Sequence, residues 1–429
     1  MSLNRKAMAL AVGAALAAPC AYAQTGGDKW EIYGKFYPEL TRTSGDGPTA
    51  ATDTVGTLAA TPAGTGAIVK RTEMQVNNTY IGFRGEKNLG RGMKAIGQLE
   101  QSVPLDEGTV TANSAGLINT FGNRDSFAGL SADWGTVRLG NMDTPFKKYG
   151  DTLGFLGIGS GNFVSPNNVI RRVSNSGASG FNLRRANSID FASPTYSGAQ
   201  LGVQYSIGNP TENGTNNAAG NPVANSAISP SANRNPRVIS MGVKWEQGPL
   251  YLAAATETHF DLFGGSGITG GGSVAGSNAN DPLVRSKDRA IQLTAVYKIS
   301  IHSIEVDANT KRYKEDGATI NNRFQEYKNT AYEVLFESRW TNEWKTAFSY
   351  IKSAAGSCSI VNNNCSTSGM EGTQINAGVT YSLDPSTYLF ALYSKLTNGT
   401  SARYNNTASQ SVTDGEDITQ MALGIAYSF

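Results

Sequence analysis

The 429-residue sequence predicts an all-β protein, a closed barrel of sixteen antiparallel strands that crosses a membrane. Segments of roughly ten residues with weakly alternating apolar and polar side chains recur along the chain, and this is the size of a tilted membrane strand. The connections between these segments alternate between short and long. The final segment, MALGIAYSF, is itself a strand that ends on a large aromatic residue.

The first 23 residues are expected to be a cleaved signal peptide. Arg5 and Lys6 precede the apolar run AMALAVGAALAAPC, and AYA then supplies a small-residue site for cleavage after Ala23. Cleavage just before Cys20, as in a lipoprotein, is the alternative, but Pro19 occupies a position that needs a small residue. Residues 24–429 are then expected to form one barrel domain beyond the inner membrane.

Sixteen segments qualify as strands. They are 29–42, 72–87, 91–103, 122–133, 134–142, 186–197, 198–210, 236–246, 249–260, 287–299, 301–315, 328–340, 342–354, 371–383, 386–397 and 416–429. Short turns such as NLGRG, DWG and LDPS alternate with long connections rich in Gly, Ser, Asn and Ala. The long ones are 43–71, 104–121, 143–185, 211–235, 261–286, 316–327, 355–370 and 398–415. Short turns on one rim and long loops on the other are typical of an outer-membrane barrel.

The alternation within strands predicts lipid outside and water inside. In TYIGFRGE, Ile81 and Phe83 share one face, while Tyr80, Arg84 and Glu86 share the other. One such segment would equally fit a half-buried strand of a soluble sheet, so the prediction depends on all sixteen together. Because every backbone N–H and C=O must be paired in hydrocarbon, the last strand is expected to pair with the first.

Composition excludes several other classes. Without Arg5 and Lys6 the chain carries 34 basic and 34 acidic residues, so it offers no general attraction to nucleic acid. No segment after the signal peptide approaches 18 consecutive apolar residues, which argues against helical membrane spans. A large soluble periplasmic or secreted β-protein remains the alternative.

The cysteines left after the signal peptide, Cys358 and Cys365, lie close together in the polar segment SCSIVNNNCS. In an oxidising compartment this spacing predicts a small disulfide that closes a loop. A metal site would need further ligands, and His259 and His302 are remote in sequence, so no metal is expected.

Five stretches together carry a family resemblance: WEIYGKFYPEL, YIGFRGEKNLGRGMKAIGQLEQ, NRDSFAGLSADWGTVRLGNMDTPF, RRANSIDFASPTYSGAQLGVQYS and the closing MALGIAYSF. With them the chain resembles the Gram-negative general porins, in particular the trimeric sixteen-stranded porins of β-proteobacteria. The resemblance implies a homotrimer in the outer membrane, in contact with its lipids, that passes small ions and hydrophilic solutes without a cofactor. It also implies that the third long loop, 143–185, folds inward and narrows the channel, and that the outer-membrane assembly machinery reads Tyr427 and Phe429.

The same resemblance implies the residues of the pore constriction. Basic wall residues would be Arg84, Arg124, Arg138 and one of Arg184 or Arg185, with Glu100 as an acid in the lumen; Lys35 faces the lumen by alternation. Tyr80 stands where many relatives carry another arginine, and the acidic PEFG-type motif of enterobacterial porins is missing. Asp143 and Asp151 are the only acids of the loop, which also carries Arg171 and Arg172.

An acid-poor loop that faces arginines predicts an anion preference, because rings and ladders of basic residues favour anions. If the arginines pair with carboxylates or face the trimer centre, the pore would be nonselective. A channel specific for small carboxylates or sugars is the nearest rival function. An enzyme is not expected, since neither His259 nor His302 has a convincing catalytic neighbour in the sequence.

Overall fold

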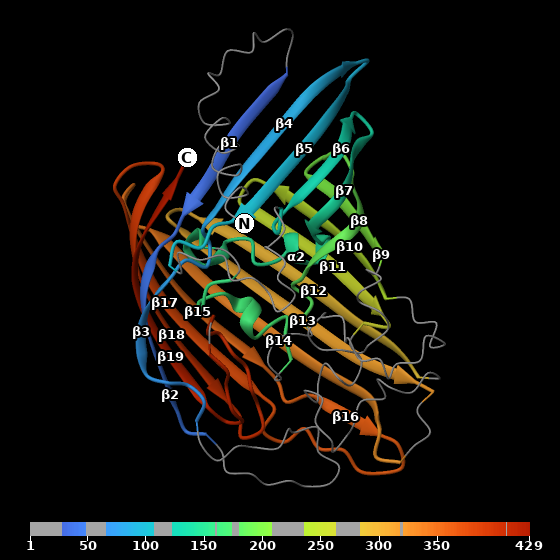
Figure 1. Cartoon of the computed structure of the whole chain (residues 1–429), viewed down its shortest axis with the longest axis vertical. Helices are drawn as coiled ribbons and strands as arrows, with labels where there is room; N and C mark the ends of the chain where they lie inside the picture. The colour runs from blue at the N-terminus through green and yellow to red at the C-terminus, as the bar shows by residue number, and fades with distance from the viewer. Residues whose placement is uncertain are drawn as a thin grey trace, which may run out of the picture.

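The computed structural model describes residues 28–48, 66–106, 122–158, 161–173, 180–207, 236–262, 284–317, 321–408 and 410–429. Over these residues the strands form one antiparallel sheet that closes on itself as a barrel (Figure 1). The expected signal peptide, residues 1–23, and parts of most of the expected long loops lie outside the described residues.

The sixteen predicted wall strands are all present, and the described residues form them as nineteen separate strands. The first wall strand consists of β1 (Lys29–Phe36) and β2 (Glu39–Asp46), and the second of β3 (Arg71–Gln75) and β4 (Tyr80–Gly90). The short β16 (Ser357–Ile360) is an addition to a connection and pairs with β14. The others are β5 (Met93–Ser102), β6 (Ser126–Ala132), β7 (Gly135–Asp143), β8 (Arg184–Ala192), β9 (Ala199–Ile207), β10 (Arg237–Gln247), β11 (Leu250–Phe260), β12 (Arg285–Ile299), β13 (His302–Asp316), β14 (Phe324–Arg339), β15 (Trp344–Ser353), β17 (Gly372–Ser382), β18 (Thr387–Asn398) and β19 (Asp417–Ser428).

The barrel closes between its first and last strands, as the terminal alternation predicted. β19 pairs with β2 and, at its end, with β1. The Gly34 amide donates to the Phe429 carbonyl at 3.0 Å, and the Phe429 amide donates back to the Gly34 carbonyl at 3.1 Å. A Cβ at Gly34 would lie 2.6 Å from the Phe429 ring, so this close approach requires glycine.

Two wall strands predicted to be continuous are interrupted at neighbouring points. Pro38 separates β1 from β2, because proline has no N–H to donate to a ladder. The second wall strand breaks between Gln75 and Tyr80, where the Thr79 amide donates to the Val76 carbonyl at 3.0 Å in a tight turn. The Tyr37 amide then donates to the Thr79 hydroxyl at 2.9 Å, which joins the two breaks.

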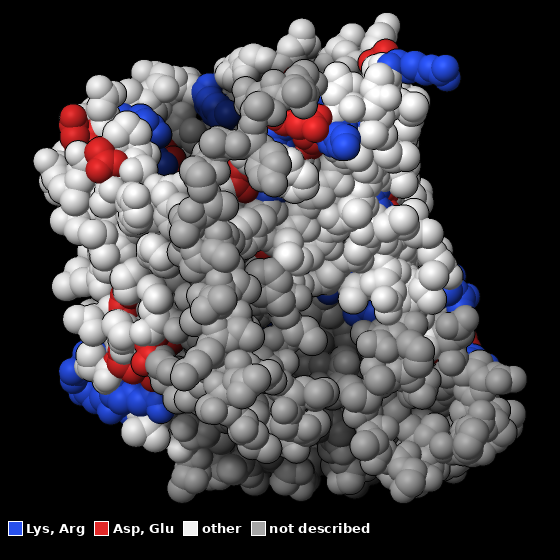
Figure 2. All heavy atoms as spheres, turned by 45° about the horizontal axis from the view of Figure 1, so that its top comes forward, with Lys and Arg blue, Asp and Glu red and all other residues white. Residues whose placement is uncertain are grey.

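Side chains alternate between a lipid-facing outer surface and a lumen-facing inner surface. On β19, Met421, Leu423, Ile425 and Tyr427 are 39–67% exposed, whereas Ala422 and Ala426 are buried against the interior. On the face shown in Figure 2, charged side chains gather near the two ends of the described wall and are sparse between them. Within the described residues, none of the helices has the length and hydrophobicity to span a bilayer.

The described parts of the third long connection, 143–158, 161–173 and 180–185, fold inward and fill much of the barrel interior (Figure 1). They include short helical turns, α2 (Pro145–Lys148), α3 (Gly154–Gly157) and the 3-10 turn η1 (Pro166–Asn168). Phe146, Phe155, Phe163 and Phe181 of this loop are at most 1% exposed. They pack against inward-facing apolar residues of the wall, so the loop supplies the core that the barrel would otherwise lack.

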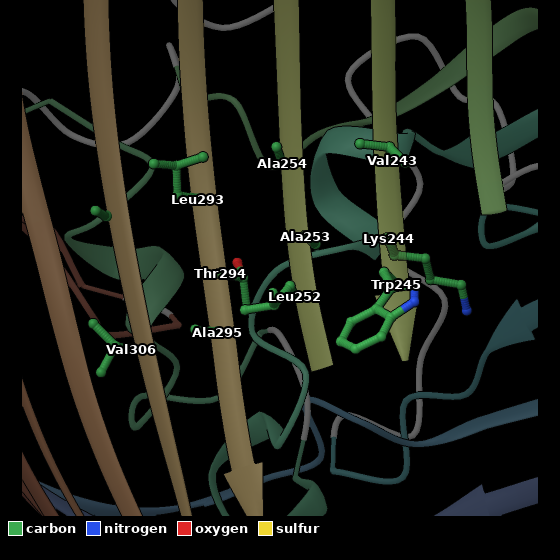
Figure 3. Close-up of a pocket in the computed structure, with 11 residues that line it drawn as sticks. Val243, Lys244, Trp245, Leu252, Ala253, Ala254, Leu293, Thr294, Ala295 and Val306 are labelled. Carbon is green, nitrogen blue, oxygen red and sulfur yellow. The ribbon is translucent and has the colours of Figure 1, made fainter. Parts of the chain in front are cut away.

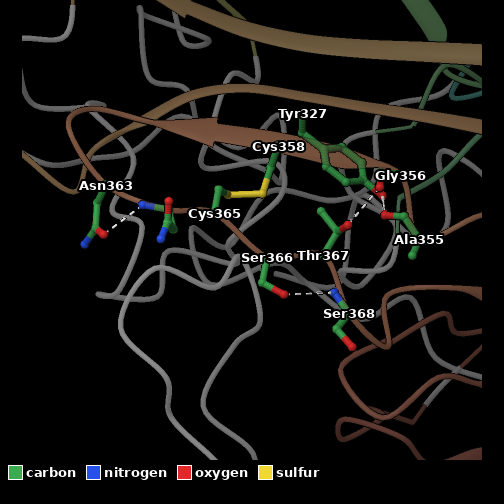
Figure 4. The surroundings of a disulfide bond; sticks show 10 residues. Tyr327, Ala355, Gly356, Cys358, Asn363, Cys365, Ser366, Thr367 and Ser368 are labelled. Carbon is green, nitrogen blue, oxygen red and sulfur yellow. Dashed lines mark hydrogen bonds between the residues drawn. A yellow bond between two sulfur atoms is a disulfide. The ribbon is translucent and has the colours of Figure 1, made fainter.

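Cys358 and Cys365 form a disulfide with a Cα–Cα distance of 5.7 Å (Figure 4). It clips the connection that contains β16, next to Tyr327 of the wall. The Tyr327 hydroxyl donates to the Ala355 carbonyl at 2.9 Å, and the Thr367 hydroxyl donates to the Gly356 carbonyl at 2.8 Å. The first bond holds the connection to β14 of the wall, and the second closes the connection on itself.

Candidate pore constriction

The inward loop is fastened to the wall by polar contacts in its middle and in its first part. Near the break in the first wall strand, the Asn162 amide donates to both carboxylate oxygens of buried Glu39, at 3.0 and 3.1 Å. On the same side of the barrel, Gln374 and Asn376 of β17 donate to the carbonyls of Phe163 and Val164, at 2.9 and 2.8 Å. The loop backbone therefore finds its hydrogen-bond partners on inward-facing wall residues.

A second set of contacts fixes the first part of the loop. The Phe146 amide donates to the Ser240 hydroxyl of β10 at 3.0 Å. The amides of Thr152 and Leu153 both donate to the Glu305 carboxylate of β13, at 2.6 and 2.7 Å. These bonds position α2 and α3 against the wall, with one surface of the loop facing the lumen.

Behind the loop lies a buried cluster of four carboxyl groups around one guanidinium. Arg171, 1% exposed, donates from Nε to the Gln292 side chain at 2.7 Å. The carboxyl groups that act on this region are Asp151, Glu305, Asp307 and Glu333. Burial raises the pKa of Asp151 to about 7, against the opposing attraction of Arg171. Asp151 and Arg171, expected at the channel surface, are thus placed between loop and wall instead.

The lumen is lined on one side by a set of cations, here called the basic wall: Lys35, Arg84, Arg124, Arg138, Lys148 and Arg184. Arg84 of β4 makes a bidentate pair with Glu31 of β1, with nitrogen–oxygen distances of 2.8 and 3.0 Å. Arg124, two residues before β6, pairs with Glu100 of β5. Both carboxylates lie on wall strands, not on the loop.

The other arginines of the basic wall are paired in the same manner. Arg138 of β7 pairs with Asp190 of β8, and Lys148 of α2 lies 3.8 Å from the other oxygen of the same carboxylate. Burial lowers the pKa of Lys148, and Asp190 opposes this effect.

Arg184 contacts two carboxylates, Asp125 at 2.6 Å and Asp143 at 3.1 Å. Asp143 is shared with Lys147 at 2.9 Å. The loop acid Asp143 is therefore neutralised by two cations before it can act on the lumen.

Lys35 differs from the arginines, because it forms no ion pair within the described part of the chain. Its ammonium lies 3.5 Å from the Gly157 carbonyl of the loop, and 5.0 and 5.8 Å from the ring centroids of Tyr37 and Tyr388. Lys35 is also the cross-strand partner of Tyr80. It faces the loop where loop and wall approach each other.

Aromatic rings support the guanidinium groups of the basic wall. Arg84 lies 4.7 Å from the Tyr33 ring centroid and Arg124 lies 4.6 Å from that of Tyr80. The Tyr33 hydroxyl donates to Glu100 at 3.0 Å. Cation–π contact and ion pairing together hold these side chains flat against the wall. Tyr80, which replaces an expected arginine, thus supports a neighbouring arginine.

Some of the predicted residues are not brought to this cluster. Arg185 is buried, so of the two neighbouring candidates Arg184 is the member of the basic wall. Arg172 lies in the loop beyond η1, where burial lowers its pKa. The wall carboxylates Glu31 and Asp190 were not singled out from the sequence. The period-two pattern could have identified Glu31, since it shares a face with Tyr33 and Lys35.

The two histidines lie at opposite ends of the barrel. His259 is fully buried, contacts Glu257 at 2.8 Å and stacks on Phe181 with ring centroids 4.4 Å apart. His302 contacts the Ser338 hydroxyl at 2.7 Å and stacks on Phe336. Each histidine therefore has a packing partner and a polar partner of its own, and the two do not share a site.

A family profile described as Gram-negative porin matches residues 8–429. Among curated proteins, the major outer membrane protein P.IB of Neisseria gonorrhoeae is 32% identical over 127 residues, which is 29% of this chain and 31% of that protein. The P.IB protein of Neisseria lactamica is 44% identical over 73 residues, 17% of this chain and 19% of that protein. The matched region thus spans less than a third of the length of these relatives.

Solved structures support the fold. The anion-selective porin from Comamonas acidovorans aligns with a TM-score of 0.65 at 17% identity, over 94% of this chain and all of that one. OmpT of Vibrio cholerae, folded in vitro, aligns with a TM-score of 0.58 at 12% identity, over 95% of this chain and all of that one. Family and fold point to a channel rather than an enzyme. With the closed barrel and its inward loop, the full-length family match shows that the chain belongs to the Gram-negative porins, proteins of the outer membrane.

Proposed function

We propose that the protein is a general diffusion porin for small hydrophilic solutes and ions, with a modest preference for anions. The observation that carries the proposal is the charge balance at the basic wall. Each arginine there has a carboxylate partner, but Lys35 has none among the described residues and Lys148 shares Asp190 with Arg138. In the loop, Asp143 is neutralised by ion pairs and Asp151 is buried between loop and wall. Positive charge therefore remains in excess at the basic wall.

The size of this preference follows from the pairing. Neutral pairs contribute little field at a distance, so the excess charge of Lys35 and Lys148 dominates over roughly one Debye length, ~8 Å at physiological salt. A sixteen-stranded barrel is wide enough to hold water around the inward loop. The structural neighbour from Comamonas acidovorans is an anion-selective porin, which is consistent with this proposal.

We further propose that the chain assembles as a homotrimer through its lipid-facing wall and is recognised by the outer-membrane assembly machinery through Tyr427 and Phe429. Both aromatic side chains face outward, each 44% exposed, at the end of the barrel with the short turns. A membrane barrel carries its aromatic girdle at such a position. The signal peptide at residues 1–23 belongs to the same proposal.

A channel specific for sugars is less well supported, because sugar binding needs free aromatic faces along the lumen. Two of the available faces, those of Tyr33 and Tyr80, are covered by Arg84 and Arg124. A site for small carboxylates would use the same arginines, but these already have carboxylate partners.

Liposome swelling tests the proposed function. Vesicles that contain the refolded protein should admit a small neutral sugar, a sugar acid of the same size faster, and an amino sugar more slowly. Rates should rise in proportion to solute concentration. Saturation, or block of the ion current by one of these solutes, would instead indicate a substrate-specific channel.

A further inference from the structure

The connection that carries the disulfide shares an apolar core with the inward loop. We call this connection, residues 355–370, the disulfide clip. Ile360 and Met370 of the clip, 4% and 1% exposed, belong to one cluster of buried side chains with Val173 and Phe181 of the inward loop. The two cysteines of the clip pack against the same cluster. The clip therefore covers the core on which this part of the inward loop rests.

A continuous series of contacts joins the disulfide to the loop. Cys358 of β16 lies directly opposite Tyr327 of β14, beside which Figure 4 shows it, and Tyr327 lies directly opposite Tyr313 of β13. The Tyr313 ring packs edge-on against Phe181 of the loop, with ring centroids 5.6 Å apart. All three aromatic side chains are 0% exposed. Displacement of the clip would uncover Tyr327 and weaken the packing that holds Phe181.

The wall behind this cluster is a single sheet, so the cover of its inner face comes from within the barrel. On the opposite surface, strands β10–β13 carry an apolar groove of about 450 Å³ (Figure 3). Its lining includes Leu252, Leu293 and Val306, which are 42–57% exposed. Within the described residues, none of these three belongs to the cluster. The clip and the inward loop therefore depend on each other for burial.

Small molecules can reach the disulfide from the mouth of the barrel. Cys358 and Cys365 are half-buried, and their neighbours Ser357, Ser359 and Asn364 are exposed. The long connections of such barrels are extracellular, so the clip meets the external solution. A disulfide that solvent reaches is open to attack by a thiolate.

We propose that the redox state of this disulfide controls how firmly the clip holds the inward loop, and thereby the width of the channel. The reductant is a small thiol. Its thiolate attacks one cysteine sulfur and breaks the S–S bond, which leaves a mixed disulfide, while the other cysteine takes up a proton. A second thiol then displaces the first from the mixed disulfide and releases the remaining cysteine. Two thiols are oxidised to one disulfide, and both cysteines are reduced. A small disulfide reverses these steps.

Reduction acts on the detached state of the clip. The intact bond limits the conformations that residues 358–365 can adopt once they leave the core, and the opened segment has more of them. Detachment then becomes more favourable, and the inward loop loses part of its cover. More of the barrel interior beside β12–β14 becomes filled with water. The effect on ion current rests on the proposed channel function, whereas the effect on the loop does not.

Hydrogen exchange, measured by mass spectrometry on the refolded protein before and after treatment with dithiothreitol, tests the proposal. The Phe181 amide, which donates to the Arg171 carbonyl at 2.9 Å, reports on the loop. Its exchange, corrected for the intrinsic rate, should become roughly tenfold faster after reduction. Reoxidation with oxidised glutathione should restore the original rate. Single-channel conductance should rise on reduction and fall on reoxidation.

Three variants separate the disulfide from the contacts around it. Cys358→Ser with Cys365→Ser should exchange at the reduced rate in both conditions and should not respond to the reductant. Ile360→Ala should speed exchange at Phe181 with the disulfide intact, because it removes a contact between clip and core. Leu293→Ala is the matched control, since it removes an apolar side chain from the outer surface of the wall, and it should leave that rate unchanged.

Faster exchange confined to the clip, with an unchanged rate at Phe181, would overturn the proposal. An equal response to the reductant in the double serine variant would overturn it too, as would faster exchange at Phe181 without any change in conductance. Absence of conductance in both redox states would instead contradict the proposed function, and the exchange rates would still decide whether the disulfide controls the loop. If the double serine variant does not fold, reduction of the folded wild type and Ile360→Ala decide the question.

Discussion

At Arg124 a positive charge is balanced at close range by Glu100, while the Tyr80 ring covers its flat face. Removing the arginine alone leaves the Glu100 carboxylate beside the lumen without its paired cation. Arg124→Gln should therefore shift selectivity toward cations, by roughly twofold in the chloride-to-potassium permeability ratio. Reversal potentials of single channels measure this change. Arg138→Gln, which leaves Asp190 with only Lys148, should shift it in the same direction.

The double variant Arg124→Gln with Glu100→Gln is the matched control for this prediction. Since the pair is neutral as a unit, its removal should return the permeability ratio close to that of the wild type. If the double variant is as cation-shifted as the single one, the arginine acts on ions independently of Glu100.

Lys35 is expected to contribute more to selectivity than its single charge among many would suggest. It has no carboxylate partner among the described residues and faces Gly157 where loop and wall approach each other. Lys35→Gln should lower the chloride preference roughly twofold. Lys395→Gln removes a lysine from the outer surface of β18 and should change nothing in the same recording. Equal effects of both variants would refute the placement of Lys35 in the constriction.

At the scale of elements, the attachment of the inward loop should depend on pH through Asp151. The pKa of Asp151 is raised to about 7 in the attached loop, while a detached loop would return it to ~4. At a pH between these two values, Asp151 is protonated in the attached loop and ionised in the detached loop. Attachment is therefore strongest below pH ~4 and weakens as the pH rises toward 7. Amide hydrogen exchange at Thr152 and Leu153, corrected for its intrinsic rate, should show faster opening at pH 7.5 than at pH 5.

Asp151→Asn should reduce this pH dependence, because an amide does not titrate. Asp384→Asn, in the turn between β17 and β18, changes the same kind of side chain far from the loop and should leave it intact. Full pH dependence in Asp151→Asn would assign the effect to the neighbouring wall carboxylates instead.

The wall strands were predictable from sequence because each strand has lipid on its outer face and the barrel interior on its inner face. Apolar and polar side chains therefore alternate with a period of two residues. The interruption at Pro38 could have been predicted locally, since proline has no N–H to donate to a ladder. The interruption at Val76–Thr79 was missed, since it is joined to the first through the Tyr37 amide and the Thr79 hydroxyl, 42 residues apart in the chain. The prediction that the loop folds inward was based on family resemblance alone. The loop's side chains meet wall residues more than a hundred positions away, so no local pattern reveals that Arg171 and Asp151 lie behind it.

For the whole molecule, the closing contact of Phe429 with the first strand predicts a defect in assembly when its ring is removed. Phe429→Ala leaves the backbone bonds to Gly34 available but loses the ring contact with Phe36, 5.5 Å between centroids. Less folded protein should reach the outer membrane, which heat-modifiable migration in SDS gels measures.

Leu423→Ala provides the comparison for that prediction. It removes a lipid-facing side chain from the same strand, away from the closing contact, and should leave the folded yield close to that of the wild type. If both variants assemble equally well, the terminal aromatic has no special part in assembly.

The most direct test of the proposed anion preference is the reversal potential of the wild-type protein in a planar bilayer with a KCl gradient. The excess charge of Lys35 and Lys148 predicts water-filled channels with a potential of the sign for chloride preference, weakened as the salt concentration rises. A cation-selective sign, or the absence of any conductance from correctly folded barrels, would contradict it.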